Sequence, residues 1–386
     1  MLVPKLRFKE FNDEWNYKLF NEIFEFIQNN SFSRDMLNYS ENSKIYNIHY
    51  GDILTKYGEI IDFNLISNIV PKINNDISLS KFEDKSYLKN GDIIIADTAE
   101  DLTVGKSCEV VNLHCKALAG LHTIPCRPKF KFASQYLGEY INSTSYHSQL
   151  IPYITGIKVS SISKNNIIKT KIYFPTIKEQ EKISELFSLL NKKIELQQRK
   201  IEVLKMYKRG FMKKILNNIT DSNVIKLKDI YKFTYGEGNT NPDNGGIYPV
   251  YGANGIIGGF DRYNAEESVI IGHMGAYAGN VLFEKNKHFV TYNGTIAIPK
   301  DVNKLRSKFG YYILLNANLP KICAGSGMPF LSYETLNNIK VKLPNIEIQQ
   351  KYEKIFDNIE IKICNEEKKL IYLNKLKKSL LQKMFI

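Results

Sequence analysis

The feature of this sequence that most constrains its fold is a long internal repeat. The segment that begins at Pro175 (PTIKEQEKISELFSLL) aligns without a gap with the segment that begins at Pro344 (PNIEIQQKYEKIFDNI), and the match continues for about 40 residues at a constant offset of 169. A duplicated segment of this length indicates that the chain is built as two related halves.

Each repeated segment has the pattern of a long helix. Apolar residues recur at heptad spacing, and the same heptad positions are apolar in both copies. This pattern predicts one helix over 176–216 and another over 345–386. The apolar positions are Ile183, Phe187, Leu190, Ile194, Ile201, Leu204, Phe211 and Ile215 in the first copy, and Tyr352, Phe356, Ile359, Ile363, Leu370, Leu373, Leu380 and Met384 in the second.

Polar residues interrupt both heptad patterns at matching places. Gln197 and Glu366 occupy one heptad position, and Lys208 and Lys377 occupy another. Polar residues at such positions cost stability and fix the register of coiled coils, so their agreement indicates that the two helices pair with each other. We expect an antiparallel coiled coil, against the alternative of two unrelated surface helices.

The repeat extends upstream of the helices with small gaps. Pro128-Lys129 aligns with Pro299-Lys300, and Gly156 aligns with Gly327, both at an offset of 171. The order of the predicted turns is therefore the same in both halves.

Short apolar runs bounded by turn residues predict the strands of each half. Examples are GDIIIA, which begins at Gly91, and ESVIIG, which begins at Glu267. Helical stretches follow, so the fold class we expect is α/β (α+β), with one domain over 1–175 and another over 224–344. Each is followed by its long helix, with a linker over 217–223 and pseudo-twofold symmetry between the halves.

The charge of the chain narrows the choice of binding partner. Lys and Arg exceed Asp and Glu by 13, and the pI is about 9.2. A positive field of this size favours association with a polyanion such as nucleic acid. The alternative is that lysine is common only because the source genome has a low GC content.

Several features predict a cytoplasmic protein. Charged residues at Lys5, Arg7 and Lys9 interrupt the segment where a signal peptide needs an apolar core. The longest apolar runs fall short of the roughly 20 residues of a membrane span. The five cysteines have no CxxC spacing, so we expect reduced thiols.

A protein that binds DNA needs cations for phosphates and aromatic or hydrogen-bonding side chains for base edges, on loops held by a rigid sheet. Both halves carry such residues in or beside predicted turns. For each residue taken singly, a packing role or a solvated surface role is the alternative. The candidates are Lys56, Tyr57, Lys106, His122, Arg127, Tyr153, Lys158, Arg262, His273, Tyr277, Asn280, Tyr292, Asn293, Lys321 and Ser326.

The sequence contains no convincing catalytic, cofactor or metal site. Asn241-Pro242-Asp243 lacks the second proline and the aromatic residue of an adenine-methyltransferase loop. Glu83-Asp84-Lys85 is an isolated match to a nuclease triplet, and the cysteines and histidines between Cys108 and Cys126 lack zinc-site spacing. The glycines between Gly252 and Gly259 indicate hairpin turns, without the GxGxxG spacing of a nucleotide loop.

Taken together, two dissimilar α/β domains, each followed by a nearly copied long helix that opens with a proline and a glutamine, resemble the specificity subunit of type I restriction-modification systems. The resemblance covers the whole chain. The second half contains YPVYGANGIIGGFDRY, VIIGHMGAYAGNV and FVTYNGTIAIP, which resemble common target-recognition domains of that family. The first half contains GDIIIADTAEDLTVGKSCEV, which resembles another frequent type.

The resemblance implies a DNA-binding subunit that is not itself an enzyme. It implies that each target-recognition domain reads one half of a bipartite, asymmetric DNA site and that the helix pair sets the gap. Two methylation subunits and the restriction subunits would be the protein partners. S-adenosylmethionine, ATP and Mg²⁺ would bind to those partners, and no cofactor would bind to this chain. Two alternatives remain: a DNA-modifying enzyme with an unrecognised site, and a coiled-coil scaffold that does not bind DNA.

Overall fold

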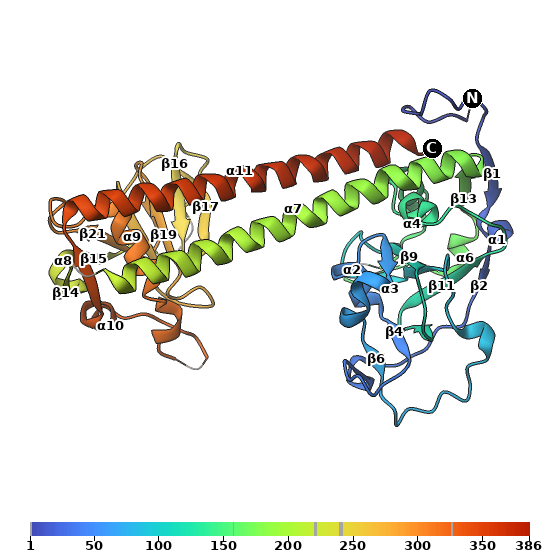
Figure 1. Cartoon of the computed structure of the whole chain (residues 1–386), viewed down its shortest axis with the longest axis horizontal. Coiled ribbons are helices and arrows are strands. Elements are labelled where there is room, and N and C mark those ends of the chain that lie inside the picture. Colours follow the sequence, from blue (N-terminus) through green and yellow to red (C-terminus); the bar gives the residue numbers. More distant parts are fainter. Residues whose placement is uncertain (1, 157, 220–221, 239–241, 326) are drawn as a thin grey trace. The chain divides into compact units, whose positions relative to one another are not determined.

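The computed structural model describes residues 2–156, 158–219, 222–238, 242–325 and 327–386. The chain divides into two compact units (Figure 1). Unit 1 comprises Met1–Leu196 and Leu370–Ile386, and unit 2 comprises Gln197–Lys369. Each unit contains one α/β domain together with part of each long helix, which confirms the predicted fold class.

Unit 1 is built on a five-stranded sheet in the order β2-β11-β7-β9-β5. The central strand β7 has four buried residues, and Ile93 and Ile95 pack into a different apolar core from Ile94 and Ala96. Successive side chains of a strand point to opposite faces of the sheet, so a continuous apolar run is what a sheet covered on both faces requires. The strands are β2 (Phe24–Phe26), β5 (Ile60–Asp62), β7 (Ile93–Ala96), β9 (Ser107–Val111) and β11 (Thr123–Pro128).

Unit 2 repeats this plan with a four-stranded sheet in the order β15-β21-β18-β19. In β18, Val269 and Ile271 pack into one core while Ile270 packs into another, as in β7. A second sheet has the order β17-β16-β20. The strands are β15 (Tyr231–Tyr235), β16 (Tyr248–Gly252), β17 (Gly255–Phe260), β18 (Ser268–Gly272), β19 (Val281–Glu284), β20 (Phe289–Val290) and β21 (Gly294–Pro299).

The shorter elements complete each unit. In unit 1 they are β1 (Asn16–Leu19), α1 (Phe20–Ile23), β3 (Leu37–Asn38), β4 (Tyr46–Ile48), α2 (Tyr50–Thr55), α3 (Phe63–Ile66), β6 (Lys72–Ile73), β8 (Thr98–Ala99), β10 (Ala117–Ala119), α4 (Tyr136–Ile141), α5 (Thr144–Leu150), β12 (Ser160–Ser161), α6 (Lys164–Ile167) and β13 (Lys171–Phe174). In unit 2 they are β14 (Ser222–Lys226), α8 (Leu227–Ile230), α9 (Ser307–Asn316), α10 (Tyr333–Asn338) and β22 (Lys340–Pro344). Single 3₁₀ turns occur at Arg34–Met36, Ser67–Ile69, Asp84–Ser86, Ile151–Tyr153 and Leu319–Ile322.

The contacts of the Pro-Lys turns show that these turns are equivalent in the two units. The backbone N–H of Lys129 donates to the carbonyl of Ile23 at 2.7 Å, and that of Lys300 donates to the carbonyl of Ile230 at 2.9 Å. Each lysine ammonium also donates to a carbonyl of the adjacent short helix, α1 or α8. The alignment of these turns from the sequence therefore agrees with their geometry.

The alignment of Gly156 with Gly327 is wrong, because Gly325 is the equivalent residue. The backbone bridge between Thr155 and Ser161 has its counterpart between Ala324 and Phe330, which restores the offset of 169. Gly156 and Gly325 both have a positive φ, of +109° and +96°, whereas Gly327 has open space around it. The sequence offered two nearby glycines, and only the conformation distinguishes them.

The long helices are α7 (Ile177–Asn218) and α11 (Ile346–Met384). In unit 1 the C-terminal part of α11 lies beside the first turns of α7, where the rings of Phe187 and Phe385 are 5.7 Å apart (Figure 1). In unit 2 the last turns of α7 lie beside the first turns of α11, and the rings of Phe211 and Phe356 are 6.5 Å apart. The helix segments are therefore antiparallel within each unit. None of the described helices is both long and apolar enough to cross a membrane.

Candidate nucleic-acid interface

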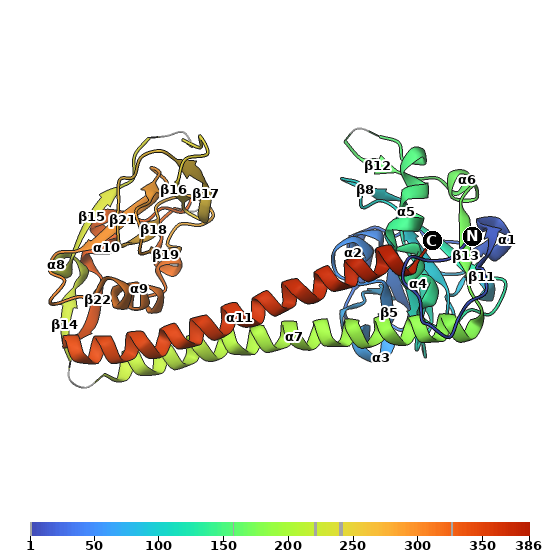
Figure 2. The same cartoon turned by 90° about the horizontal axis from the view of Figure 1, so that it is seen from above.

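In unit 2, loops from distant parts of the sequence meet where β15 and β18 end and β21 begins. Strand β21 is antiparallel to both neighbours, so these three strand ends lie at the same edge of the sheet. An aromatic cluster occupies the edge: the Tyr235 ring is 4.0 Å from Tyr333, 4.2 Å from His273 and 5.9 Å from Tyr292. This edge lies on the side of unit 2 that faces away from the long helices (Figure 2).

Hydrogen bonds hold the loops of this edge in place. Nδ1 of the buried His273 lies 3.1 Å from the carbonyl oxygen of Leu331. The side-chain amide of Asn280 donates to the carbonyl of Ala253 at 2.9 Å and so fixes the turn of the β16–β17 hairpin. His273 and Asn280, both candidates from the sequence, therefore position the loops from within.

Other candidates in unit 2 are exposed on the same edge. Tyr277 and Tyr292 are 50% and 37% exposed, and Asn293 and Lys321 are also exposed. Phenol, amide and ammonium groups supply both donors and acceptors for base edges and phosphates. Arg262 is exposed as well, pairs with Glu237 at 2.8 Å and lies over the Phe289 ring. Ser326 lies outside the described residues.

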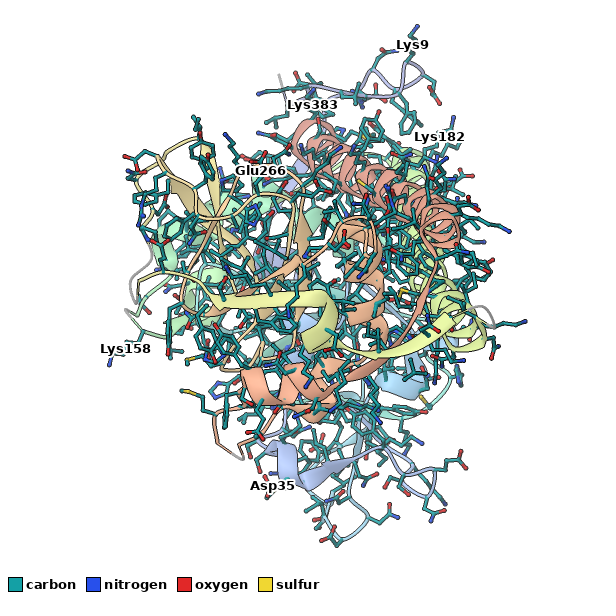
Figure 3. The ribbon with its side chains drawn as sticks, turned by 90° about the vertical axis from the view of Figure 1, so that its left-hand side faces the viewer. Lys9, Asp35, Lys158, Lys182, Glu266 and Lys383 are labelled. Atoms are coloured by element: carbon teal, nitrogen blue, oxygen red, sulfur yellow. The ribbon has the colours of Figure 1, made fainter. Side chains whose placement is uncertain are left out.

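Unit 1 presents a corresponding edge where β7 ends and β11 begins. His122 precedes β11, its Nδ1 lies 3.4 Å from a carboxylate oxygen of Asp97, and its ring is 5.2 Å from that of Tyr50. The short ladder between β8 and β12 closes the loop that carries Lys158, which is exposed and projects from the surface (Figure 3). Tyr153 is half-buried, and its ring is 5.2 Å from the Lys169 ammonium.

Three other candidates in unit 1 are held within the fold. Tyr57 is only 3% exposed and belongs to an apolar core. The ammonium of Lys106 donates to the carbonyls of Leu54 and Tyr57 at the end of α2, and burial lowers its pKa. Arg127 forms a two-bond ion pair with the buried Asp92.

Lys56 combines the two properties, because its side chain is exposed to solvent and also has a partner within the fold. Its ammonium is 2.9 Å from the buried carboxylate of Asp52, which also accepts from Arg34. The hydrogen bond that the Lys56 ammonium donates to Asp52 is the largest cause that raises the pKa of Lys56, and its hydrogen bond to the Tyr39 hydroxyl is the second. Lys56 therefore carries a firmly held positive charge at the surface of α2.

The polar heptad residues of the long helices make defined contacts. Gln197 and Glu366 bond to each other, whereas Lys208 pairs with Glu360 on α11. Lys377 instead pairs with Glu59 of the α/β domain, and its ammonium is 3.7 Å from Glu139. Sequence alone gave no sign that the two lysines have different kinds of partner.

Two glutamines, which the sequence showed only as part of the repeated opening of the long helices, dock the helices onto the domains. Gln180 is buried, donates to the carbonyl of Pro175 at 2.9 Å and accepts from the N–H of Ala133 at 3.0 Å. Gln349 donates to Pro344 at 2.9 Å and accepts from Arg306 at 3.0 Å. The signal was available, since both follow a proline at the start of a repeated helix.

Within the described ranges, no group of three or more His, Cys, Asp or Glu side chains is arranged to hold a metal ion. Cys108 and Cys126 are buried on separate strands, β9 and β11. Both side chains of the Glu83–Lys85 ion pair are at least 72% exposed. The exposed candidate residues of the two edges carry imidazole, phenol, amide and cationic groups.

Comparison with known proteins places this geometry in context. A family model for the type I restriction modification DNA specificity domain matches residues 12–206 and again residues 219–375. A putative type I specificity subunit of Mycoplasma pneumoniae is 31% identical over 129 residues, which is 32% of this chain and 42% of that protein. The aligned part is thus less than half the length of that relative.

Two solved structures share the fold over almost the whole chain. A type I restriction-modification S subunit from M. genitalium covers 100% of this chain and 99% of its own, with a TM-score of 0.58 and 17% identity. The second is a chain from a structural study of complex assembly and conformational transition of the type I R-M system. The alignment covers 95% of this chain and 96% of that chain, with a TM-score of 0.61 and 14% identity.

Proposed function

The chain belongs to the family defined by the type I restriction modification DNA specificity domain, and from this premise we propose that it directs a type I restriction-modification complex to a bipartite DNA site. The family is one of DNA-recognition subunits rather than catalytic subunits. In this proposal each unit binds one half of the site. Unit 1 binds through the edge where β7 ends and β11 begins, and unit 2 binds through the edge where β18 ends and β21 begins.

The observation that carries the proposal is the presence of the same edge in both units with different side chains on it. In unit 1 the edge presents His122 and Lys158, and in unit 2 it presents Tyr277, Tyr292 and Asn293. A shared scaffold with different hydrogen-bonding groups supports two half-sites of different sequence. The complete site is therefore expected to be asymmetric.

The exposed residues of the long helices support docking of two copies of one partner. Val203, Met206 and Tyr207 form an apolar patch on α7 in unit 2, where each is more than half exposed. Tyr372 and Leu376, at the equivalent positions 169 residues later, form a patch with Ile371 on α11 in unit 1. We call these two surfaces the helix patches. Patches repeated in this way fit two methylation subunits, one for each unit.

The partners would supply the chemistry that this chain lacks. Methylation subunits would bring S-adenosylmethionine and methylate adenine in each half-site, and restriction subunits would bring ATP and Mg²⁺. The chain would work in the cytoplasm, where these partners and their DNA substrate meet. The net charge of +13 would speed the encounter with DNA and make its affinity fall as salt rises.

The test is to map adenine methylation across the genome of a methylation-free host. The host would express this chain with and without its methylation subunit. The proposal expects one asymmetric, bipartite motif that appears only when both proteins are present. Methylation by this chain alone would identify an enzyme, and the absence of any motif together with an absence of DNA binding by the complex would favour a scaffold.

A further inference from the structure

Each unit carries a tight loop of the same construction at its candidate DNA-binding edge. A backbone bridge joins Thr155 to Ser161 in unit 1, and the equivalent bridge joins Ala324 to Phe330 in unit 2. In unit 1 this loop reaches the edge through the pairing of β12 with β8. In unit 2 it reaches the edge through a bridge between Phe330 and Met274.

A glycine closes each loop. Gly156 has a φ of +109°, and a Cβ atom there would lie 1.9 Å from the carbonyl oxygen of Val159. Gly325 has a φ of +96°, and its Cβ atom would lie 2.6 Å from the carbonyl oxygen of Met328. Both contacts are closer than real Cβ atoms allow, so the two loops share a turn that only glycine permits.

The residue three positions after each glycine exposes an apolar side chain. Val159 is 52% exposed and Met328 is 65% exposed. Single exposed apolar residues are common on protein surfaces and need no explanation. The equivalence of these two is the informative point, because the preceding residue differs completely, as Lys158 in one unit and Gly327 in the other. We call Val159 and Met328 the tip residues.

The chemistry of base pairs limits what an apolar tip can recognise. Phosphates and most base-edge atoms are polar, and an apolar side chain would desolvate them without replacing their hydrogen bonds. In the major groove, the distinctive apolar group is the C5-methyl group of thymine. A wedge between base pairs is the other use of apolar side chains. Methionine can serve as a wedge, but valine is smaller than most residues that do, so the methyl contact is the role that suits both tip residues.

We propose that Val159 and Met328 each contact a thymine methyl group in the half-site that their own unit binds. This inference rests on the proposed function. If adenine is methylated in each half-site, each half-site also contains a thymine as its partner, so both units would have reason to keep the same contact. The other groups of each edge would then read the bases that distinguish the two half-sites.

The experiment uses the complex of this chain with its methylation subunits and duplexes that carry the mapped site. Deoxyuridine replaces thymidine in one half-site at a time, which removes the methyl group and retains the base pairing. We expect the dissociation constant to rise about fourfold for each contacted methyl group, the ratio that corresponds to one buried carbon group. The variants are Val159→Thr and Met328→Gln, which keep side-chain size and add polarity.

Each variant should lose the response to deoxyuridine in one half-site only, and the two variants should affect opposite halves. Val224→Thr is the matched control, because Val224 is 67% exposed on β14 and lies outside the edge. The control should keep the wild-type response in both halves. If the complex binds the site and deoxyuridine has no effect in either half, the inference is overturned while the proposed function stands. If it binds no bipartite site at all, the proposed function itself fails.

Discussion

The side-chain amide of Gln197 donates to the carboxylate of Glu366 at 2.8 Å and to its backbone carbonyl at 2.9 Å. These residues occupy the same position in the two copies of the repeat. In an antiparallel pair of related helices, contact between equivalent residues occurs only at the centre of the pairing. This contact therefore fixes the register of α7 against α11 within unit 2.

Replacement of Glu366 by glutamine should remove a pH dependence of stability. Hydrogen bonds from Gln197, Lys200 and Lys369 lower the pKa of Glu366 from 4.5 to about 2. Because the folded-state pKa is the lower one, this stabilisation is complete above about pH 4.5 and is lost as the pH falls toward 2. The melting temperature of the wild-type protein should therefore fall more steeply between pH 5 and pH 3 than that of Glu366→Gln. Parallel curves would contradict the prediction, and Glu367→Gln, which removes a more exposed ion pair with Lys205, is the control.

Removal of either docking glutamine should destabilise the unit that contains it. Gln180→Ala or Gln349→Ala breaks buried hydrogen bonds and leaves backbone groups without partners, which costs about 2 kcal/mol in the free energy of unfolding. Denaturant titration would measure the loss. Gln350→Ala changes the exposed neighbour of Gln349 and should have little effect. Equal losses in Gln349→Ala and Gln350→Ala would mean that the buried bonds are unimportant.

The sequence was informative where the physical signal is local or repeated. Heptad spacing predicted both long helices, and the run IIIA at Ile93–Ala96 predicted a buried strand, because both patterns follow directly from the geometry of their elements. The Pro-Lys turns were aligned correctly because the same dipeptide recurs in both halves. Gly156 was misaligned, because the need for a positive φ is a property of the folded loop.

The candidate site was less accessible to sequence analysis. Lysine, arginine and tyrosine beside turns can serve either a ligand or the fold, and the choice depends on distant partners. Arg127 bonds to Asp92, 35 residues away, and Lys106 bonds to carbonyls about 50 residues away. No local pattern specifies such pairs. His273 and Asn280 were singled out for DNA, and the structure shows how they hold the loops that carry the exposed residues.

Replacement of Glu109 by glutamine should stabilise the protein more at high pH than at low pH. Burial raises the pKa of Glu109 from 4.5 to about 7, although its carboxylate accepts N–H bonds from Gln135 and Gly138. Since the folded-state pKa is the higher one, stability is lost as the pH rises from about 4.5 through 7. The stability of Glu109→Gln relative to the wild type should therefore rise by on the order of 2 kcal/mol between pH 5 and pH 8. Urea titrations at the two pH values would measure it, and a difference that does not vary with pH would refute the prediction.

A charge in one helix patch should reduce partner binding. Tyr207→Asp places a carboxylate in the α7 patch, and the desolvation of that charge should prevent one methylation subunit from docking. Native mass spectrometry should then detect one bound methylation subunit in place of two. Glu202→Gln, an exposed change on the same helix, should leave two bound. Retention of both subunits by Tyr207→Asp would exclude this surface as the docking site.

A change in helix length should alter the gap in the DNA site and leave its bases unchanged. Insertion or deletion of about four residues adds or removes roughly one turn of α7 or α11. If the helices separate two independent reading domains, methylation mapping of such a variant should show a new gap length between the original half-sites. A change in the bases of either half-site would mean that the helices take part in base recognition.

The different partners of Lys208 and Lys377 have a consequence for inheritance. Asn191 and Glu360 are equivalent helix positions. Asn191 bonds to Glu139 of the first domain, which lies near Lys377. Glu360, in contrast, is itself the acidic partner of Lys208. A genetic crossover that exchanged the α/β domains alone would bring Glu59 and Glu139 beside Lys208, where Glu360 already lies, and would remove both of these acids from the vicinity of Lys377. Crossover points beyond codons 191 and 360 would let each domain travel with the start of its own helix and would leave each lysine with its own acids.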